Sequence, residues 1–270
     1  EIYSLLTRWN PLKISNRAPH PFSHKRVLIC GLGPAGFTLS HYMLHSGHEV
    51  VAIDGLKIEP LPQDLIAWKN PTAVAFKPIY DIKQQYQNLN ERIIQGFGGV
   101  MEYGITVRWN KNYLFILRLL LERQQHFLLC DGVRFGSDFS LKDVKSYHID
   151  HVALCVGAGK PILPMIHNNL AIGVKVASDF LMTLQLSGAF QEKNFTNLVV
   201  RMPVVIIGGG LTAIDTATEV IPYYIRQIKT FAKTYHSLVH KLGKDFVERD
   251  WTPLDQSIAR EFLEHAKVFE

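Results

Sequence analysis

The chain has 270 residues, enough for one large domain or two domains of ordinary size. Hydrophobic residues make up 47% and charged residues 20%, a balance that is typical of folded proteins and excludes a disordered chain. The net charge is +5 without any long run of Lys or Arg, which argues against a nucleic-acid-binding protein. Attraction of anionic dinucleotides would account for this mild positive charge.

Three isolated cysteines, Cys30, Cys130 and Cys155, lie in apolar runs, and we expect them to be buried, reduced thiols. The sequence has no CxxC or CxxxxC, so it predicts neither a redox dithiol nor a local set of iron–sulfur ligands. No histidine pair is expected to bind a metal. We expect no transmembrane helix, no signal peptide and a cytoplasmic location, because long apolar stretches are missing and the cysteines suit a reducing compartment.

The first part of the chain predicts a β-α-β unit. Residues 1–24 contain several prolines and are expected to form an irregular arm. Strand Arg26–Cys30, a helix over about 33–47 and strand Glu49–Asp54 then follow one another with short connections. Because these connections are short, the two strands must be parallel.

The rest of the chain is expected to contain both helices and strands, with a largely helical part at the end. Beyond Tyr223 the pattern is largely helical. In chain order we expect a helical segment over 81–95, helix Tyr113–Gln125, strands Gln125–Cys130 and His151–Val156, a buried strand within Val199–Ile207, helix Leu211–Val220 stopping before Pro222, and a helix break at Asp250–Pro253.

A glycine-rich turn, GLGPAG, directly follows the first strand. In this Gly-x-Gly-x-x-Gly pattern, Gly31 permits the tight turn, Gly33 lets the backbone approach a pyrophosphate, and Gly36 lets helix and strand pack closely. The start of the helix adds unpaired N–H groups and a partial positive charge. Asp54 ends the second strand, where its carboxylate can accept hydrogen bonds from ribose hydroxyls. The alternative is a turn that binds nothing.

Pro34 and Ala35 stand between the second and third glycines, an arrangement more typical of FAD-binding proteins than of NAD dehydrogenases. We therefore include both residues in the predicted FAD site.

A second glycine turn, GGGLTA, follows Val204–Ile207. An alanine in the third position is common in NADP sites. Thr212 can bond phosphate oxygens or cap the helix, and Asp215 can face the cofactor or be an exposed, salt-bridged side chain. The predicted NAD(P)-binding residues are Gly208, Gly210, Leu211, Thr212, Ala213 and Asp215.

Four blocks resemble the glutamate synthase small-subunit type of flavoprotein. They are VLICGLGPAGFTLSHYMLHSGHEVVAID, GGVMEYGI, HVALCVGAGKPILPMI and VVIIGGGLTAIDTATE, and together they span about residues 25–220. The resemblance implies an α/β, Rossmann-like flavoprotein with two dinucleotide-binding domains. It assigns FAD to residues 25–160 and NAD(P)H to residues 161–270, which would end in a helical segment.

The resemblance also implies further FAD contacts. Gly98, Gly99 and Gly104 would lie in a loop near the isoalloxazine, although flexible turn glycines are the alternative. Val156 and Gly157 would end a strand beside FAD, where this sequence has Cys-Val-Gly instead of the family's Ala-Thr-Gly.

Two departures lead us to expect a chain truncated inside its NAD(P) domain. The family's final Gly-Asp block is missing before Glu270, and no strand with phosphate-gripping Arg residues follows the second glycine turn. The expected function is hydride transfer from NAD(P)H to FAD, with electrons passing to an iron–sulfur or amidotransferase partner. A related reductase with a ferredoxin or pyrimidine acceptor and a non-catalytic fragment are the alternatives. No catalytic side chain and no metal ligand is predicted.

Overall fold

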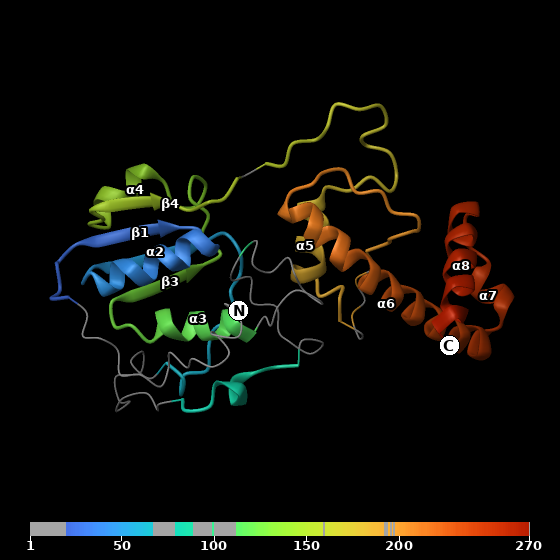
Figure 1. Cartoon of the computed structure of the whole chain (residues 1–270), viewed down its shortest axis with the longest axis horizontal. Coiled ribbons are helices and arrows are strands. Elements are labelled where there is room, and N and C mark those ends of the chain that lie inside the picture. The colour runs from blue at the N-terminus through green and yellow to red at the C-terminus, as the bar shows by residue number, and fades with distance from the viewer. Residues whose placement is uncertain are drawn as a thin grey trace. The chain divides into compact units, whose positions relative to one another are not determined.

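The computed structural model describes residues 20–66, 79–88, 99, 112–158, 160–191, 194, 196 and 198–269. These residues divide into two compact units (Figure 1). The first unit consists of the described residues up to Lys160, and the second consists of those from Pro161 onward. Most of the predicted N-terminal arm lies outside the described residues.

The first unit is built on a parallel sheet of four strands. These are β1 (Arg26–Cys30), β2 (Glu49–Asp54), β3 (Phe127–Asp131) and β4 (His151–Leu154), in the order β3-β2-β1-β4. Every neighbouring pair is parallel. The predicted α/β, Rossmann-like fold class is therefore confirmed, and β3 and β4 differ from their predicted bounds only at the ends.

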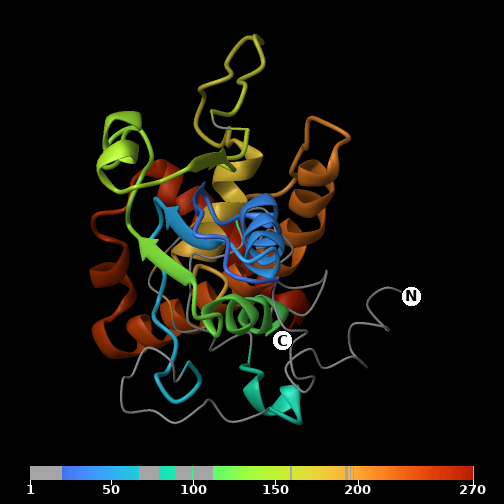
Figure 2. The ribbon, with the colours of Figure 1, turned by 90° about the vertical axis from the view of Figure 1, so that its left-hand side faces the viewer.

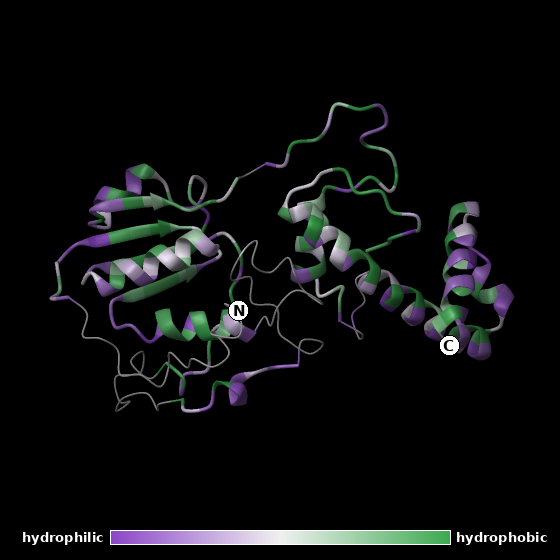
Figure 3. Ribbon diagram, viewed as in Figure 1, coloured by the Kyte–Doolittle hydropathy of each residue, from purple (hydrophilic) through white to green (hydrophobic). Residues whose placement is uncertain are grey.

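Both faces of this sheet are covered. Helix α2 (Pro34–His45) lies against one face of the sheet, as Figures 1 and 2 show. The other face packs Leu28, Cys30 and Ile53 against side chains that include Val144 of α4 (Leu141–Ser146). Because both faces are covered, β1 is apolar along most of its length instead of alternating (Figure 3).

A further apolar cluster lies under helix α3 (Asn112–Glu122), where Ile116 and Leu119 pack against Leu61 and Ile66. The helix expected over 81–95 is wrong within the described residues, where only a 3-10 turn, η2 (Ile82–Gln85), forms. Asp81 caps this turn by accepting a hydrogen bond from the Lys83 amide, and the backbone is extended again at Tyr86. The rest of the predicted helix falls outside the described residues.

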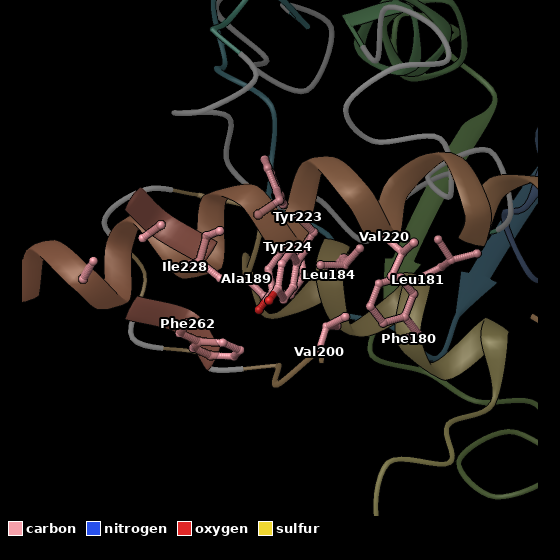
Figure 4. Close-up of a cluster of buried hydrophobic side chains, with 13 residues drawn as sticks. Phe180, Leu181, Leu184, Ala189, Val200, Val220, Tyr223, Tyr224, Ile228 and Phe262 are labelled. Atoms are coloured by element: carbon pink, nitrogen blue, oxygen red, sulfur yellow. The ribbon is translucent and has the colours of Figure 1, made fainter. Parts of the chain in front are cut away.

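The second unit is helical. It contains α5 (Ala177–Leu186), α6 (Leu211–Leu242), α7 (Lys244–Glu248), α8 (Pro253–Ala266) and the 3-10 turn η4 (Lys267–Phe269). Figure 4 shows its core, in which residues of α5, α6 and α8 meet. Thr252 and Asp255 form a capping box at the start of α8, which confirms the predicted helix break.

The strand predicted within Val199–Ile207 is wrong. The described residues of the second unit contain no strand, and Val205 and Ile207 are 82% and 73% exposed. At Val200 the backbone is paired with a side chain: its N–H donates to Gln227 Oε1 at 2.9 Å, and its carbonyl accepts from Gln227 Nε2 at 2.8 Å. A side-chain amide thus takes the place of a neighbouring strand, and an isolated apolar segment does not form a strand alone.

The predicted end of the second-turn helix before Pro222 is also wrong, because α6 continues through this proline to Leu242. A proline inside a helix removes one hydrogen bond and costs about 3 kcal/mol. Here Val220, Tyr224 and Ile228 are buried on both sides of Pro222, and each large apolar side chain contributes about 1.5–3 kcal/mol when buried. Packing therefore outweighs the local cost.

Glu261 of α8 joins three parts of the second unit. Its Oε2 accepts from Arg201 Nε at 2.7 Å, and its Oε1 accepts from the Met202 amide at 3.0 Å. The hydroxyl of Tyr224 in α6 donates to the same Oε1 at 3.3 Å. Burial raises the pKa of Glu261, but the bonds from Met202 and Arg201 outweigh this effect and hold the pKa below its usual value.

We expect Glu261→Gln to lower the free energy of unfolding by about 1–3 kcal/mol at neutral pH, since a charged acceptor is lost. A carboxyl group with a lowered folded-state pKa stabilises the fold above its unfolded pKa. This stabilisation disappears as the pH falls through the folded value. Urea denaturation at neutral pH and below about pH 4 should show the wild-type advantage shrinking in acid.

Glu264→Gln is the matched control, because Glu264 is exposed on the same helix. It should leave the free energy of unfolding nearly unchanged. An equal effect of both substitutions, or a Glu261→Gln effect that does not depend on pH, would contradict the role given to Glu261.

Candidate functional site

The first glycine turn connects β1 to α2 at the carboxyl ends of the strands. Gly31 has a φ of 98°, in the left-handed region that favours glycine. Its N–H donates to the Ile53 carbonyl at 2.8 Å. A Cβ on Gly31 would lie 2.5 Å from the Cys155 carbonyl oxygen. The turn therefore packs directly against the backbone that follows β4.

Gly36 and Gly33 differ in their surroundings. A Cβ on Gly36 would lie 1.8 Å from the Gly31 carbonyl oxygen, so only glycine allows α2 to approach the end of β1 this closely. A Cβ on Gly33 would meet nothing within 4 Å. The glycine at position 33 thus leaves open space beside the backbone, which is what the approach of a pyrophosphate requires.

The start of α2 is accessible to an anion. Gly33 is the N-cap, Pro34 occupies the first turn, and no side chain caps the helix. Ala35 is exposed and adds only a methyl group. The first N–H groups of a helix have no partner within that helix, and they carry its partial positive charge.

Asp54 ties the turn to β2. Its Oδ2 accepts from the Leu32 amide at 2.8 Å, and its Oδ1 accepts from the Leu56 amide at 2.9 Å. The sequence predicts only a ribose contact for Asp54, because no local pattern indicates these bonds to the turn. Each carboxylate oxygen accepts about two hydrogen bonds, so the half-buried Asp54 keeps acceptor capacity for a ligand hydroxyl.

Several predicted residues come together around this turn. A Cβ on Gly99 would lie 3.4 Å from Gly33 Cα, although the two are far apart in the sequence. A Cβ on Gly31 would also lie 3.3 Å from Val156 Cα, and the next residue, Gly157, has a φ of 75°. Gly98 and Gly104 lie outside the described residues. The structure thus groups the described members of the predicted FAD site, and their role in binding stays a prediction.

The cysteines do not form a redox pair. All three are free; Cys30 is buried, whereas Cys130 and Cys155 are only half-buried, which corrects the expectation that all three are buried. Burial, with a contribution from the neighbouring Cys155, raises the pKa of the Cys30 thiol to about 11, and burial also raises the pKa of Cys155. Both thiols are therefore protonated and weakly nucleophilic at neutral pH.

The second glycine turn starts α6. Gly208 has a φ of 135°, Gly210 is the N-cap, and no side-chain bond caps the helix, so Thr212 does not act as a cap. A Cβ on Gly209 or Gly210 would meet nothing within 4 Å, and one on Gly208 would lie 3.6 Å from Ala213 Cβ. This helix start is open in the same way as that of α2.

Two side chains in the first turns of α6 differ in burial. Leu211 is 70% exposed, while Asp215 is buried. Asp215 is therefore not an exposed side chain, and its contact with a cofactor stays a prediction.

Two classes of feature are not found in the part of the chain that the structure describes. It contains no cluster of three or more His, Cys, Asp or Glu side chains that could hold a metal. No helix among these residues has the length and apolar character needed to cross a membrane.

Comparison with known proteins gives one family and two curated relatives. The family model described as pyridine nucleotide-disulphide oxidoreductase matches residues 25–257. The chain is 50% identical over its whole length to Uncharacterized protein RP006 of Rickettsia prowazekii (strain Madrid E), covering 35% of that protein. It is 24% identical over 82% of its length to Glutamate synthase [NADPH] small chain of Bacillus subtilis (strain 168), covering 37% of it. The chain thus spans about a third of each relative.

Substitution of the two glycines should separate folding from ligand binding. We expect Gly36→Ala to destabilise the first unit by about 3 kcal/mol or more, because its Cβ would overlap the Gly31 carbonyl. Gly33→Ala should cost about 1 kcal/mol or less, the cost of replacing a glycine N-cap. It should weaken ADP binding by about tenfold or more, because a methyl group would stand where the pyrophosphate approaches.

Urea denaturation and ADP titration of both variants would check this prediction. Unfolding of Gly33→Ala at the same denaturant concentration as Gly36→Ala, or unchanged ADP affinity of Gly33→Ala, would show that the turn does not have this division of roles.

Proposed function

Because the chain belongs to the pyridine nucleotide-disulphide oxidoreductase family, we propose that it binds FAD at the first glycine turn and reduces it with NAD(P)H. The observation that carries the proposal is the geometry of β1, the turn and α2. There, Gly33 is the N-cap of a helix that no side chain caps, and the space beside Gly33 is open. Asp54 ends the neighbouring strand and bonds to the same turn. These are the groups that hold the pyrophosphate and ribose of a dinucleotide.

The chain's own residues would position the flavin. The first N–H groups of α2 would bind the pyrophosphate, and the carboxylate of Asp54 would accept from the ribose. Gly99 and the Val156–Gly157 segment lie close enough to the turn to border the rest of the ligand. FAD, when bound, would supply the chemistry by accepting a hydride from the nicotinamide, and the protein would supply orientation and exclusion of water.

The second glycine turn is the proposed NAD(P)H site. Its support is the exposed, uncapped start of α6 and the open positions at Gly209 and Gly210. One relative carries NADPH in its name, which favours a nicotinamide donor of this kind. The choice between NADH and NADPH follows from the titration described below.

We propose that electrons leave the flavin without a protein disulfide. The three cysteines are free and none forms a close sequence pair, and the two thiols nearest the turn are protonated. An iron–sulfur domain or an amidotransferase partner is the proposed acceptor, as the resemblance to the glutamate synthase small-subunit type of flavoprotein implies. Ferredoxin-type or pyrimidine-type acceptors remain the alternative reactions, and a cytoplasmic location stays a prediction.

A second candidate function is binding of a single dinucleotide without hydride transfer. The absence of a strand from the described residues of the second unit favours it, because phosphate-binding turns of this type normally follow a buried strand. The two candidates differ in whether the bound flavin is reduced.

We expect the purified chain with added FAD to show absorption bands near about 370 and 450 nm, where oxidised flavin absorbs. Anaerobic NADPH or NADH should bleach these bands, and the more effective nucleotide is the donor. Gly210→Val should bind FAD normally but lose the bleaching, because its side chain would fill the open start of α6.

Asp54→Ala should weaken FAD binding, and the exposed Asp64→Ala serves as its matched control. A chain that binds FAD but is not bleached by either nucleotide would support the second candidate. A chain that takes up no FAD would contradict the flavin reductase, and one that binds neither FAD nor a nicotinamide nucleotide would contradict both candidates.

A further inference from the structure

The strand order sets out how a dinucleotide would lie across the first unit. The pyrophosphate would be held at the end of β1 and the ribose at Asp54 on β2. The next strand in the sheet is β3, whose last residue, Asp131, is in register with Asp54. Neighbouring strands lie about 4.8 Å apart, so the adenine beyond the ribose would reach the segment that follows β3.

This segment is bonded to the end of β2. The Val133 amide donates to the Asp54 carbonyl at 2.9 Å, and the Gly132 amide donates to the Leu56 carbonyl at 3.0 Å. Asp131 Oδ2 accepts from the Ile58 amide at 3.1 Å and pairs with Lys57 Nζ at 3.3 Å. The residue after Val133, Arg134, is therefore held beside the predicted ribose site.

The backbone of Arg134 is held in a tight turn. Its N–H donates to Asp138 Oδ2 at 2.8 Å, and its carbonyl accepts from the Asp138 amide at 3.0 Å and the Phe139 amide at 3.3 Å. A side chain on such a turn starts from a defined position, which lowers the entropy lost when it contacts a ligand.

The side chain of Arg134 lies over Gly55, the residue directly after Asp54. A Cβ on Gly55 would be 3.3 Å from Arg134 Nε and 3.5 Å from Arg134 Cβ. The φ of Gly55 is outside the left-handed region, so the backbone does not require glycine there. Its missing side chain instead makes room for the arginine. Arg134 is exposed, and its guanidinium makes no ion pair with any described residue.

We propose that Arg134 is a specificity-determining residue that stacks its guanidinium on the adenine ring of the dinucleotide bound at the first glycine turn. This inference rests on the proposed function, in that it needs a nucleotide at this turn. A planar guanidinium stacks on aromatic rings, which an ammonium group does not do equally well.

The test compares binding of FAD, ADP and UDP by the 270-residue chain and its Arg134→Ala and Arg134→Lys variants, using calorimetry or fluorescence. Arg134→Ala should weaken FAD and ADP binding by about five- to thirtyfold, the usual effect of losing one stacked side chain. Binding of UDP, whose smaller ring stacks less, should fall less, so the preference for ADP decreases. The affinities of Arg134→Lys should resemble those of Arg134→Ala, because lysine keeps the positive charge but lacks the planar guanidinium.

Lys142→Ala is the control, since Lys142 is an exposed cation on α4 outside this turn, and it should bind all three ligands as the wild type does. Urea denaturation checks that the variants are folded. Wild-type affinity of Arg134→Ala, full function of Arg134→Lys, or equal losses for ADP and UDP would each overturn the stacking role while leaving the proposed function intact. A wild-type chain that binds neither FAD nor ADP would overturn the proposed function, and the role of Arg134 with it.

Discussion

The close approach of α2 to the end of β1 is the contact on which the rest of the first unit depends. Gly36 touches the Gly31 carbonyl, and Gly31 in turn touches the carbonyl of Cys155 after β4. Any side chain at either position would push the helix or the neighbouring strand away from the turn. The same closeness directs the first amides of α2 to the carboxyl edge of the sheet, so one packing constraint produces both the core and the proposed anion site.

Asp54 has a structural part in this arrangement besides its proposed part in binding. Its two oxygens accept the amides of Leu32 and Leu56, which joins the glycine turn to the segment after β2. That segment is bonded in turn to the residues after β3. The ends of three strands are therefore connected through one carboxylate and its backbone neighbours. A ligand at this edge would meet a preformed surface and not a set of independent loops.

In the second unit, side chains form the backbone hydrogen bonds that a neighbouring strand would form in a sheet. Gln227 pairs with both backbone groups of Val200, and the Tyr223 hydroxyl accepts from the Leu198 amide at 3.1 Å. These bonds satisfy the backbone of an apolar segment with groups from one long helix. Burial on both sides of Pro222 keeps that helix continuous. The described part of this unit thus forms its core from helices together with Ala189, Phe190 and Val200 of the segment between α5 and α6, while Val205 and Ile207 are exposed.

The sequence by itself determined the first β-α-β unit, since an apolar strand, glycine spacing and a terminal acid are all local signals. It also determined the start of α8, because Thr252 and Asp255 cap it within one turn. Only the tertiary structure decided that Val204–Ile207 forms no strand and that α6 continues through Pro222, since strand pairing and burial depend on residues distant in the sequence. The bonds of Asp54 and the position of Arg134 over Gly55 were decided in the same way, because they join separate strand ends whose proximity no local pattern encodes.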